Sequence, residues 1–450
     1  MKANIKFILS LFIIVFFACE RWVEINTPEN QLTTDKVFAD TATLNGAVAN
    51  MYDQFNRSID VSYNKYMGLY TDELQYQGSN QEVLEFYNGN ILAANSMILN
   101  IWSRLYAVIY QANDIIEQLT NSSSIPSQVS TKAIGEAKFI RAFAYYYLAN
   151  TFGDVPLILT TDVTLNASSA RTESSEITNQ IVNDLTESKV LLSTSPDGPL
   201  SRTRANRWAA TALLSRLLIQ QEKWEEAYSA ASEVINSKYF TPLSDLSVVF
   251  RSGSRETIFQ FWTQNGFIQD ATNLIALSGV PAYPLSSGLV QAFEEEDQRK
   301  VNWTGTITAN GTTYYYSYKY KNRSSGSTSF PEYLIALRCS EQYLIRAEAE
   351  LHLGNTAGAI DDINTIRVRA GLSSLPADLN SQECFKALEQ EKRVEMFMEW
   401  GYRYIDLKRT ERIYNVMSQY KPNWTEHSDL LPIPQREINV NQNLTQNPGY

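Results

Sequence analysis

Apolar residues recur at spacings of three and four along most of the chain, and this spacing is typical of helices that bury one face. The pattern is clearest over residues 41–57, 90–119, 131–150, 177–192 and 382–417. Gly153 and Pro156 follow the third segment and should end its helix. The pattern therefore predicts a mainly helical protein.

Two segments have the pattern of helix pairs joined by a short turn. In residues 208–237 the turn at 222–224 is followed, at spacings of four and three, by Ala227, Ala231 and Val234. In residues 339–370 the turn at 354–356 is followed in the same register by Ala359, Ile363 and Ile366. This spacing is that of the second half of a tetratricopeptide repeat, where a small residue after the turn lets two helices cross closely.

The middle of the chain, residues 241–337, interrupts the helical pattern and is rich in Gly, Ser, Thr and Tyr. Asn310-Gly311 separates alternating segments at 301–308 and 312–320, which predicts a β-hairpin. Binding loops commonly lie on such inserts. We expect an all-α protein: an irregular tetratricopeptide-like helical-repeat scaffold with an inserted loop-rich region that contains this small hairpin.

The first residues predict export. Lys2 and Lys6 precede an apolar run at 7–17, which is too short to span a bilayer, and Ala18-Cys19 follows. We interpret residues 1–18 as a lipoprotein signal peptide and Cys19 as its acylated cysteine; an ordinary signal peptide cleaved nearby is the alternative. Acylation would hold the protein at a membrane without a spanning helix.

These features divide the chain into five predicted parts: the signal peptide 1–18, the lipidated Cys19 with a tether 19–34, an N-terminal helical part 35–240, the insert 241–337, and a C-terminal helical part with an extended tail 338–450. The tail is expected to be extended from residue 430 because it carries Pro432, Pro434 and Pro448.

Composition and charge argue against several classes of function. The chain has 450 residues, 44% hydrophobic and 19% charged, with a net charge of −11. No basic run could neutralise a row of phosphates, so nucleic acid is not an expected partner. His352 and His427 are too few for a zinc or histidine-based catalytic cluster, and we expect no cofactor. Cys339 and Cys384 are interpreted as buried thiols, with a single disulfide left open.

Two groups of charged residues have structural and functional interpretations. The run Glu294–Asp297 could form a solvated face or hold a structural Ca²⁺ through its oxygens. Glu391, Glu395, Glu399 and Arg403 recur every four residues and are interpreted as solvated or structural salt bridges with no catalytic role. Each exposed pair would add about 0.3–0.5 kcal/mol.

Aromatic residues make up 12% of the chain, and several lie outside the helical pattern. An aromatic face can take the apolar side of a pyranose while a nearby polar group bonds its hydroxyls. The alternating Tyr314, Tyr316, Tyr318 and Tyr320 are instead interpreted as strand residues packing on helices. The candidate ligand-binding residues are Asp72, Tyr76, Phe86, Tyr87, Asn88, Trp262, Tyr283 and Trp303.

The segment Glu-Trp-Gly-Tyr-Arg-Tyr-Ile-Asp-Leu-Lys-Arg at 399–409 and the end of the chain, with Leu-Pro-Ile-Pro at 431–434 and Gln-Asn-Pro-Gly-Tyr at 446–450, resemble the C-terminal signature of the SusD/RagB family. Blocks at 102–113, 136–156, 209–228 and 343–372 look like family blocks in family order. The resemblance covers essentially the whole chain.

This resemblance implies four irregular tetratricopeptide-like helix pairs and an outer-membrane lipoprotein that lies as a lid on a SusC-like TonB-dependent transporter. It implies that an oligosaccharide is bound and not cleaved, with residues 72–88 at the family's binding edge and Trp262 and Tyr283 in its insert. Two other functions stay open. A helical glycoside hydrolase would need only two carboxylates, although the insert at 241–337 interrupts the repeat of such a toroid. The other is a peptide-binding or protein-adaptor member of the same kind.

Overall fold

The computed structural model describes residues 34–59, 61–121, 123–195, 202–264, 266–324 and 331–450. The predicted signal peptide 1–18, Cys19 and all but the last residue of the predicted tether lie outside the described residues. Within these ranges, no helix combines the length and apolar character that crossing a membrane requires.

Helices form most of the described structure. The first group, up to residue 191, consists of α2 (Thr34–Val37), α3 (Thr41–Ile59), α4 (Val61–Tyr70), α5 (Gln81–Asn88), α6 (Ser96–Asn121), α7 (Ser127–Phe152), α8 (Val163–Asn166) and α9 (Ser174–Leu191). The second group consists of α10 (Arg207–Gln220), α11 (Trp224–Asn236), α12 (Gln269–Leu274), α13 (Ser287–Ala292), α14 (Gln298–Trp303), α15 (Cys339–His352), α16 (Thr356–Arg369), α17 (Ser381–Glu395), α18 (Tyr402–Arg409), α19 (Ile413–Met417) and α20 (Gln435–Val440).

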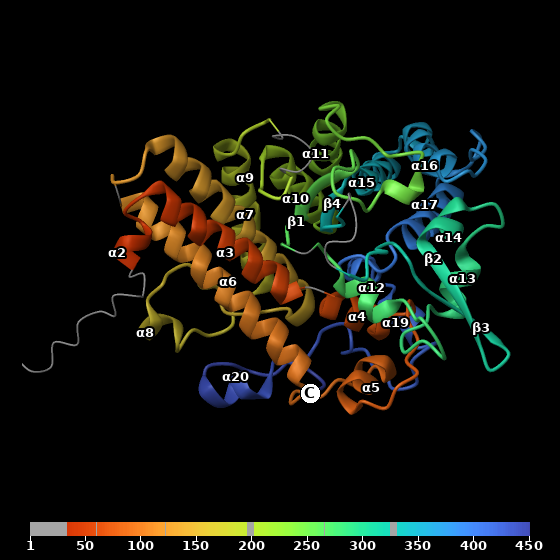
Figure 1. Ribbon diagram of the computed structural model, residues 1–450, viewed down its shortest axis with the longest axis horizontal. Coiled ribbons are helices and arrows are strands. Elements are labelled where there is room, and N and C mark those ends of the chain that lie inside the picture. The colour runs from red at the N-terminus through yellow and green to blue at the C-terminus, as the bar shows by residue number, and fades with distance from the viewer. Residues whose placement is uncertain (1–33, 60, 122, 196–201, 265, 325–330) are drawn as a thin grey trace, which may run out of the picture.

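The long helices pack on their neighbours in sequence, in the order α6, α7, α9, α10, α11, α15, α16 and α17. Figure 1 shows this course from α3, α6 and α7 on the left, over α10 and α11, to α15–α17 on the right. The two predicted helix pairs are confirmed as α10–α11 and α15–α16. Ala227 and Ala359, the small residues after each turn, are both fully buried, as a close helix crossing requires.

The insert contains more regular structure than its sequence predicts. Strand β1 (Thr257–Phe261) pairs antiparallel with β4 (Leu334–Arg338), and a short 3₁₀ helix covers Leu246–Val248. The predicted hairpin is present as β2 (Thr304–Ala309) and β3 (Thr312–Ser317), with the Asn310-Gly311 turn. The predicted start of the first strand, at residue 301, was wrong, because residues 301–303 belong to α14. Asp297 is the N-cap of this helix, and its side chain accepts a hydrogen bond from the backbone N–H of Arg299.

Several other boundaries differ from the sequence pattern. The helix expected from residue 90 begins at Ser96, because Glu85 accepts hydrogen bonds from the Leu92 backbone and the Asn95 side chain and holds residues 90–95 in a turn. The segment 72–88 was not expected to be helical, yet α5 occupies its second half. The tail is not extended throughout, because α20 interrupts it.

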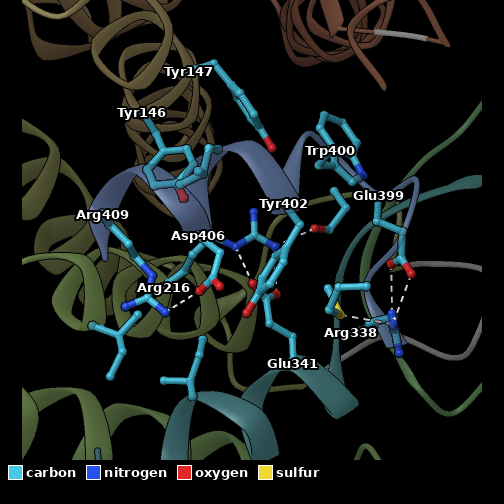
Figure 2. Close-up of a pocket in the computed structure, with 15 residues that line it drawn as sticks. Tyr146, Tyr147, Arg216, Arg338, Glu341, Glu399, Trp400, Tyr402, Asp406 and Arg409 are labelled. Atoms are coloured by element: carbon cyan, nitrogen blue, oxygen red, sulfur yellow. Dashed lines mark hydrogen bonds and ion pairs between the residues drawn. The ribbon is translucent and has the colours of Figure 1, made fainter. Parts of the chain in front are cut away.

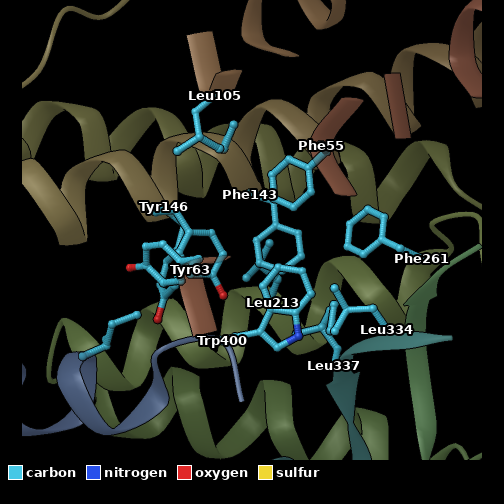
Figure 3. Close-up of a cluster of buried hydrophobic side chains, with 14 of the residues drawn as sticks. Phe55, Tyr63, Leu105, Phe143, Tyr146, Leu213, Phe261, Leu334, Leu337 and Trp400 are labelled. Carbon is cyan, nitrogen blue, oxygen red and sulfur yellow. The ribbon is translucent and has the colours of Figure 1, made fainter. Parts of the chain in front are cut away.

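Aromatic rings from the N-terminal helical part, the insert and the C-terminal helical part meet in the main core (Figure 3). Phe55 of α3 stacks on Phe143 of α7 and on Phe261 of β1, with ring centroids 5.0 and 5.2 Å apart. Trp400 lies 5.8 Å from Phe143 and 5.7 Å from Phe261. The insert therefore contributes to the core as well as to the surface, since β1 is buried at every position.

The four-residue repeat of Glu391, Glu395 and Glu399 is buried, so of the two interpretations its salt bridges are structural and not solvated. These carboxylates face Arg299 and Lys319 of the insert. They also face Arg338 and Arg369 of the C-terminal helical part. We call the following residues the buried ion cluster: Glu256, Asp297, Arg299, Lys319, Arg338, Arg369, Glu391, Glu395 and Glu399.

Arg338, at the end of β4, is the most connected member of the buried ion cluster. It donates to Glu256 and to Glu399, each at 2.8 Å, and to Glu395. Glu395 also pairs with Arg369 and, at 3.0 Å, with Arg299. Burial alone would raise the pKa of Glu395, but the three arginines outweigh it and hold that pKa far below its usual range.

Both cysteines of the folded region are free and buried, which confirms the interpretation as thiols over a disulfide. Of the alternating tyrosines, Tyr320 packs edge-on against Phe250 and Phe267 in the core. Tyr316 and Tyr318 are half-buried and contact each other. The packing interpretation therefore holds fully only for Tyr320.

We predict that Glu395→Gln lowers the free energy of unfolding by about 3–5 kcal/mol, because the substitution keeps the shape but removes the one carboxylate that three buried arginines share. Chemical denaturation followed by tryptophan fluorescence measures the change. The matched control is Asp53→Asn, which neutralises the exposed Asp53–Arg57 pair at 2.8 Å and should change stability by less than about 0.5 kcal/mol. A loss below about 1 kcal/mol for Glu395→Gln would contradict this role.

Candidate functional site

Two candidate residues from distant parts of the chain form one stacked pair at the surface. Tyr76 and Tyr283 lie with ring centroids 5.5 Å apart and ring planes 20° apart, and both rings are half-buried. We call Tyr76 and Tyr283 the aromatic pair. The Lys65 ammonium lies 5.0 Å from the centre of the Tyr283 ring. Lys65 was not a candidate in the sequence analysis, because a single lysine gives no sequence signal of which side chains it contacts in the fold.

Backbone pairing fixes the position of the aromatic pair. The Gln75 backbone N–H donates to the Pro284 carbonyl at 2.8 Å, and the Gln77 N–H donates to the Ala282 carbonyl at 3.0 Å. One residue further on, Leu285 donates to the Tyr315 carbonyl of β3 at 2.8 Å. The loop that carries Tyr283 is therefore held between the residues after α4 and the hairpin.

Apolar side chains extend this surface. Leu277 and Val280, in the same loop as Tyr283, are 75% and 37% exposed. The start of the loop is fixed by Arg323, whose guanidinium donates to the Ala271 carbonyl at 3.0 Å and to the Ile275 carbonyl. An anchored loop with exposed apolar and aromatic groups can offer a ligand a flat face without first becoming ordered.

Asp72 supports this site from beneath and does not reach its surface. Its carboxylate is buried, and it accepts from Arg403 at 2.9 and 3.1 Å and from Arg393 at 2.9 Å. Burial would raise the pKa of Asp72, but the two arginines lower it below its ordinary value. The Asp72 carbonyl also accepts from the Ser286 hydroxyl, three residues after Tyr283.

The remaining candidates do not join the aromatic pair. Phe86 is fully buried, 4.7 Å from the Tyr66 ring, and Trp303 is fully buried, donating its indole N–H to the Leu246 carbonyl. Tyr87 and Asn88, at the end of α5, are half-buried, and the Lys421 ammonium lies 4.7 Å from the Tyr87 ring centre. Phe86 and Trp303 offer no surface to a ligand, because both rings are buried in the hydrophobic core.

Trp262 is 55% exposed directly after β1. Among the described residues, no ring contact joins it to the aromatic pair. Trp262 therefore stays a separate candidate.

The acidic run at 294–297 does not gather into a metal site. Asp297 is buried and forms an ion pair with Arg299 at 2.8 Å. Both carboxylate oxygens of Glu294 accept hydrogen bonds from Arg367, so they are already engaged. Across the part of the chain that the structure describes, no group of three or more His, Cys, Asp or Glu side chains could hold a metal ion. The solvated-face interpretation holds for Glu294, Glu295 and Glu296, which are exposed, and was wrong for Asp297, which is an ion-pair partner in the interior.

A small polar cavity lies between α7, α10, α15 and α18 (Figure 2). Its volume is about 30 Å³, which leaves room for about one water molecule. Arg216 forms a two-pronged pair with Glu341 at 2.6 and 2.7 Å, and Arg409 pairs with Asp406. Its charges are paired within the protein, so it is a packed polar interior and too small for a sugar.

The chain matches two family models with related descriptions. Residues 294–450 match "SusD family", and residues 22–219 match "Starch-binding associating with outer membrane". The chain is also similar to SusD-like protein P2 of Formosa agariphila, with 27% identity over 434 residues that cover 83% of this chain and 84% of that protein.

Solved structures share the fold. A SusD superfamily protein from Bacteroides vulgatus superposes with a TM-score of 0.80 at 21% identity, covering 91% of this chain and 99% of its own. A structure described as a laminarin binding SusD-like protein superposes with a TM-score of 0.77 at 22% identity, with the same coverage of both chains. The all-α fold predicted from the sequence is confirmed.

Glu73, beside Asp72, provides a pH test of the packing beneath the site. Burial raises the pKa of Glu73 to about 7, and its carboxylate accepts from the Met398 backbone at 3.1 Å. The unfolded chain loses this proton near the ordinary value of 4.5, so folded-state stability falls as pH rises from about 4.5 to about 7.

We predict that Glu73→Gln raises the free energy of unfolding by about 1–3 kcal/mol at pH 8 and by much less at pH 5, because the amide removes the cost of a buried charge. Urea denaturation at both pH values measures the difference. The exposed Glu225→Gln on α11 is the control and should change stability by less than about 0.5 kcal/mol at either pH. A gain of equal size at pH 5 and pH 8 would show that ionisation of Glu73 is not the cause.

Proposed function

Because this chain belongs to the SusD family, we propose that it is a nutrient-binding protein of the outer membrane that captures an oligosaccharide without cleaving it. The observation that carries the proposal is the half-buried aromatic pair at the surface, Tyr76 and Tyr283, held in place by backbone hydrogen bonds. The rings present a flat apolar face of the kind that packs on the C–H side of a pyranose. The description of a structural neighbour as laminarin binding supports a glycan as the ligand class.

The acids next to the aromatic pair support binding over hydrolysis. Glycoside hydrolysis needs two carboxyl groups that flank the scissile bond. Asp72 is buried and engaged by two arginines, and Glu73 is buried with its pKa raised to about 7. Neither carboxyl group reaches the surface that the rings offer, so these two acids cannot serve as the acid and base for a sugar bound at the aromatic pair.

The same proposal includes an anchor and a partner. Cys19 would carry acyl chains that hold the protein at the outer membrane, and the protein would deliver its ligand to a SusC-like TonB-dependent transporter. The support is the signal-like start of the chain together with the outer-membrane association named in the description of the model that matches residues 22–219. An acyl anchor supplies the apolar area that membrane attachment needs when no helix spans the bilayer.

We predict that the double variant Tyr76→Ala, Tyr283→Ala weakens oligosaccharide binding by about tenfold or more, which corresponds to about 1.4 kcal/mol of lost ring contact. A glycan array selects the ligand, and isothermal titration calorimetry measures the loss. Tyr228→Ala on α11 removes a tyrosine that is 39% exposed away from this surface and should bind like the wild type. Unchanged affinity of the double variant would reject this site, and shortened products in the wild-type incubation would reject the non-catalytic role.

For the anchor, we expect wild-type protein expressed with its own leader to fractionate with outer membranes, to incorporate a radiolabelled fatty acid and to co-purify with a β-barrel transporter. Cys19→Ser should lose the label and be largely released from the membrane fraction, because the acyl chains on Cys19 are the proposed anchor. Its purified form should bind the ligand as the wild type does. A wild-type protein that carries no label, or that is found in the cytosol, would contradict this part of the proposal.

A further inference from the structure

A second, larger cavity lies at the end of α7, where α9, α10, α18 and the C-terminal tail meet. Its volume is about 410 Å³, within the range of small-molecule sites. Its neutral polar lining includes Asn150, Thr178, Gln220 and Asn447. Ile181, Leu217 and Leu430 supply apolar walls. None of its lining residues belongs to the aromatic pair or to the loop of Tyr283, so it is a separate site.

Two cations face this cavity and bond only to neutral oxygens. The Lys408 ammonium donates to the Asn150 carbonyl at 2.8 Å. The Arg171 guanidinium donates to the Asp154 carbonyl at 2.8 Å, to the Thr445 carbonyl at 3.0 Å and to the Asn447 side chain. Among the described residues, neither cation forms a salt bridge, whereas the buried arginines around Glu395 all do.

Asp154 is the only acid in the lining, and its Oδ1 already accepts from the Ser174 backbone at 2.8 Å. Burial lowers the pKa of Lys408 to about 8, and it also lowers the pKa of Arg171. Within the described part of the chain the Lys408 ammonium forms no salt bridge, although Asp429 partly offsets the effect of burial on its pKa. An anion entering the cavity would add a favourable charge interaction. The cavity is therefore electrostatically suited to an anionic ligand in a protein whose net charge is −11.

We propose that this cavity binds one acidic sugar unit, with the carboxylate or sulfate group of the sugar facing Lys408 and Arg171. The Gln220 amide donates to the Asn150 side-chain oxygen at 2.6 Å, and the Thr178 hydroxyl donates to the Ser174 carbonyl at 2.6 Å. Each oxygen keeps a lone pair, and the Gln220 amide keeps a second N–H, for the hydroxyls of a sugar. The apolar walls are suited to the C–H face of the ring. The inference does not rest on the aromatic pair, so either site can fail without the other.

Isothermal titration calorimetry on the purified protein at pH 7 tests the ligand class with four probes: galacturonate, galactose 6-sulfate, galactose and sodium sulfate. We expect at least one acidic sugar to bind at least tenfold more tightly than galactose and more tightly than inorganic sulfate. Tighter binding of galacturonate would identify a carboxylate as the preferred group, and tighter binding of galactose 6-sulfate would identify a sulfate. Equal binding of galactose, equal binding of inorganic sulfate, or no binding of either acidic sugar would overturn the proposal.

Variants assign the binding to this cavity. Lys408→Met removes the ammonium and should weaken acidic-sugar binding at least tenfold. Thr178→Phe fills the cavity from a half-exposed position on α9 and should have the same effect, which keeps the test decisive if Lys408→Met does not fold. Wild-type affinity in the folded variants would overturn the proposal.

Lys421→Met is the matched control for removing a buried lysine. The Lys421 ammonium also bonds to backbone carbonyls, those of Leu69 at 2.6 Å and Tyr87 at 2.7 Å, and burial also lowers its pKa to about 8. It does not line the cavity, so acidic-sugar binding should be unchanged. The double variant Tyr76→Ala, Tyr283→Ala should also retain acidic-sugar binding, which separates a failure of this inference from a failure of the proposed function.

A pH series gives an independent readout. The charged groups near the Lys408 ammonium are Asp429, which raises its pKa against burial, and Asp154 and Arg171, which line the same cavity. Because the empty cavity holds Lys408 near a pKa of about 8, acidic-sugar affinity should fall between pH 7 and pH 9.5 in the wild type. It should change little over this range in Lys408→Met. A pH-independent wild-type affinity would overturn the role of Lys408.

Discussion

The pairing of buried charges between the insert and α17 is the constraint on which the rest of the structure depends. Glu395 meets Arg299, Arg338 and Arg369, which come from α14, the end of β4 and α16. Each of these ions would be costly in the interior without its partners. The insert can therefore pack on the helical scaffold only in an arrangement that brings all of them together. Buried ion pairs fix the position of the insert on the scaffold more strictly than apolar contacts alone, because apolar surfaces can shift against each other at little cost.

Helix α17 transmits this constraint to the candidate site. On one side its carboxylates Glu391 and Glu395 hold the insert, and on another its Arg393 pairs with Asp72 beneath the aromatic pair. The chain that follows α17 adds Arg403, which also pairs with Asp72. Tyr76 follows Asp72 by four residues, and Tyr283 arrives on the insert. The two rings stack because both of their segments are fixed to the same helix region.

The turn after α17 carries backbone strain that packing offsets. Met398 and Trp400 have φ of 53° and 51°, in the left-handed region that is uncommon for residues with a side chain. Gly401 follows at 64°, and a β-carbon there would lie 2.8 Å from the Tyr63 ring. The Trp400 indole fills the core and donates to the Ile335 carbonyl of β4. The Glu-Trp-Gly-Tyr-Arg segment thus joins the ion cluster, the aromatic core and the support of Asp72 within five residues.

The sequence by itself determined the helices, both repeat turns, the hairpin turn at Asn310-Gly311 and the family, because periodicity, turn chemistry and motif spacing are local properties. It could also mark Tyr76 and Tyr283 as candidates, but with equal weight it marked Phe86 and Trp303, which are buried. Only the tertiary structure decided between them, and only it showed that the Glu391–Glu399 repeat faces cations in the interior. It alone brought Lys408 and Arg171 to one cavity. The physical reason is that burial and charge pairing depend on which distant segments meet, and no local pattern records what a side chain will face.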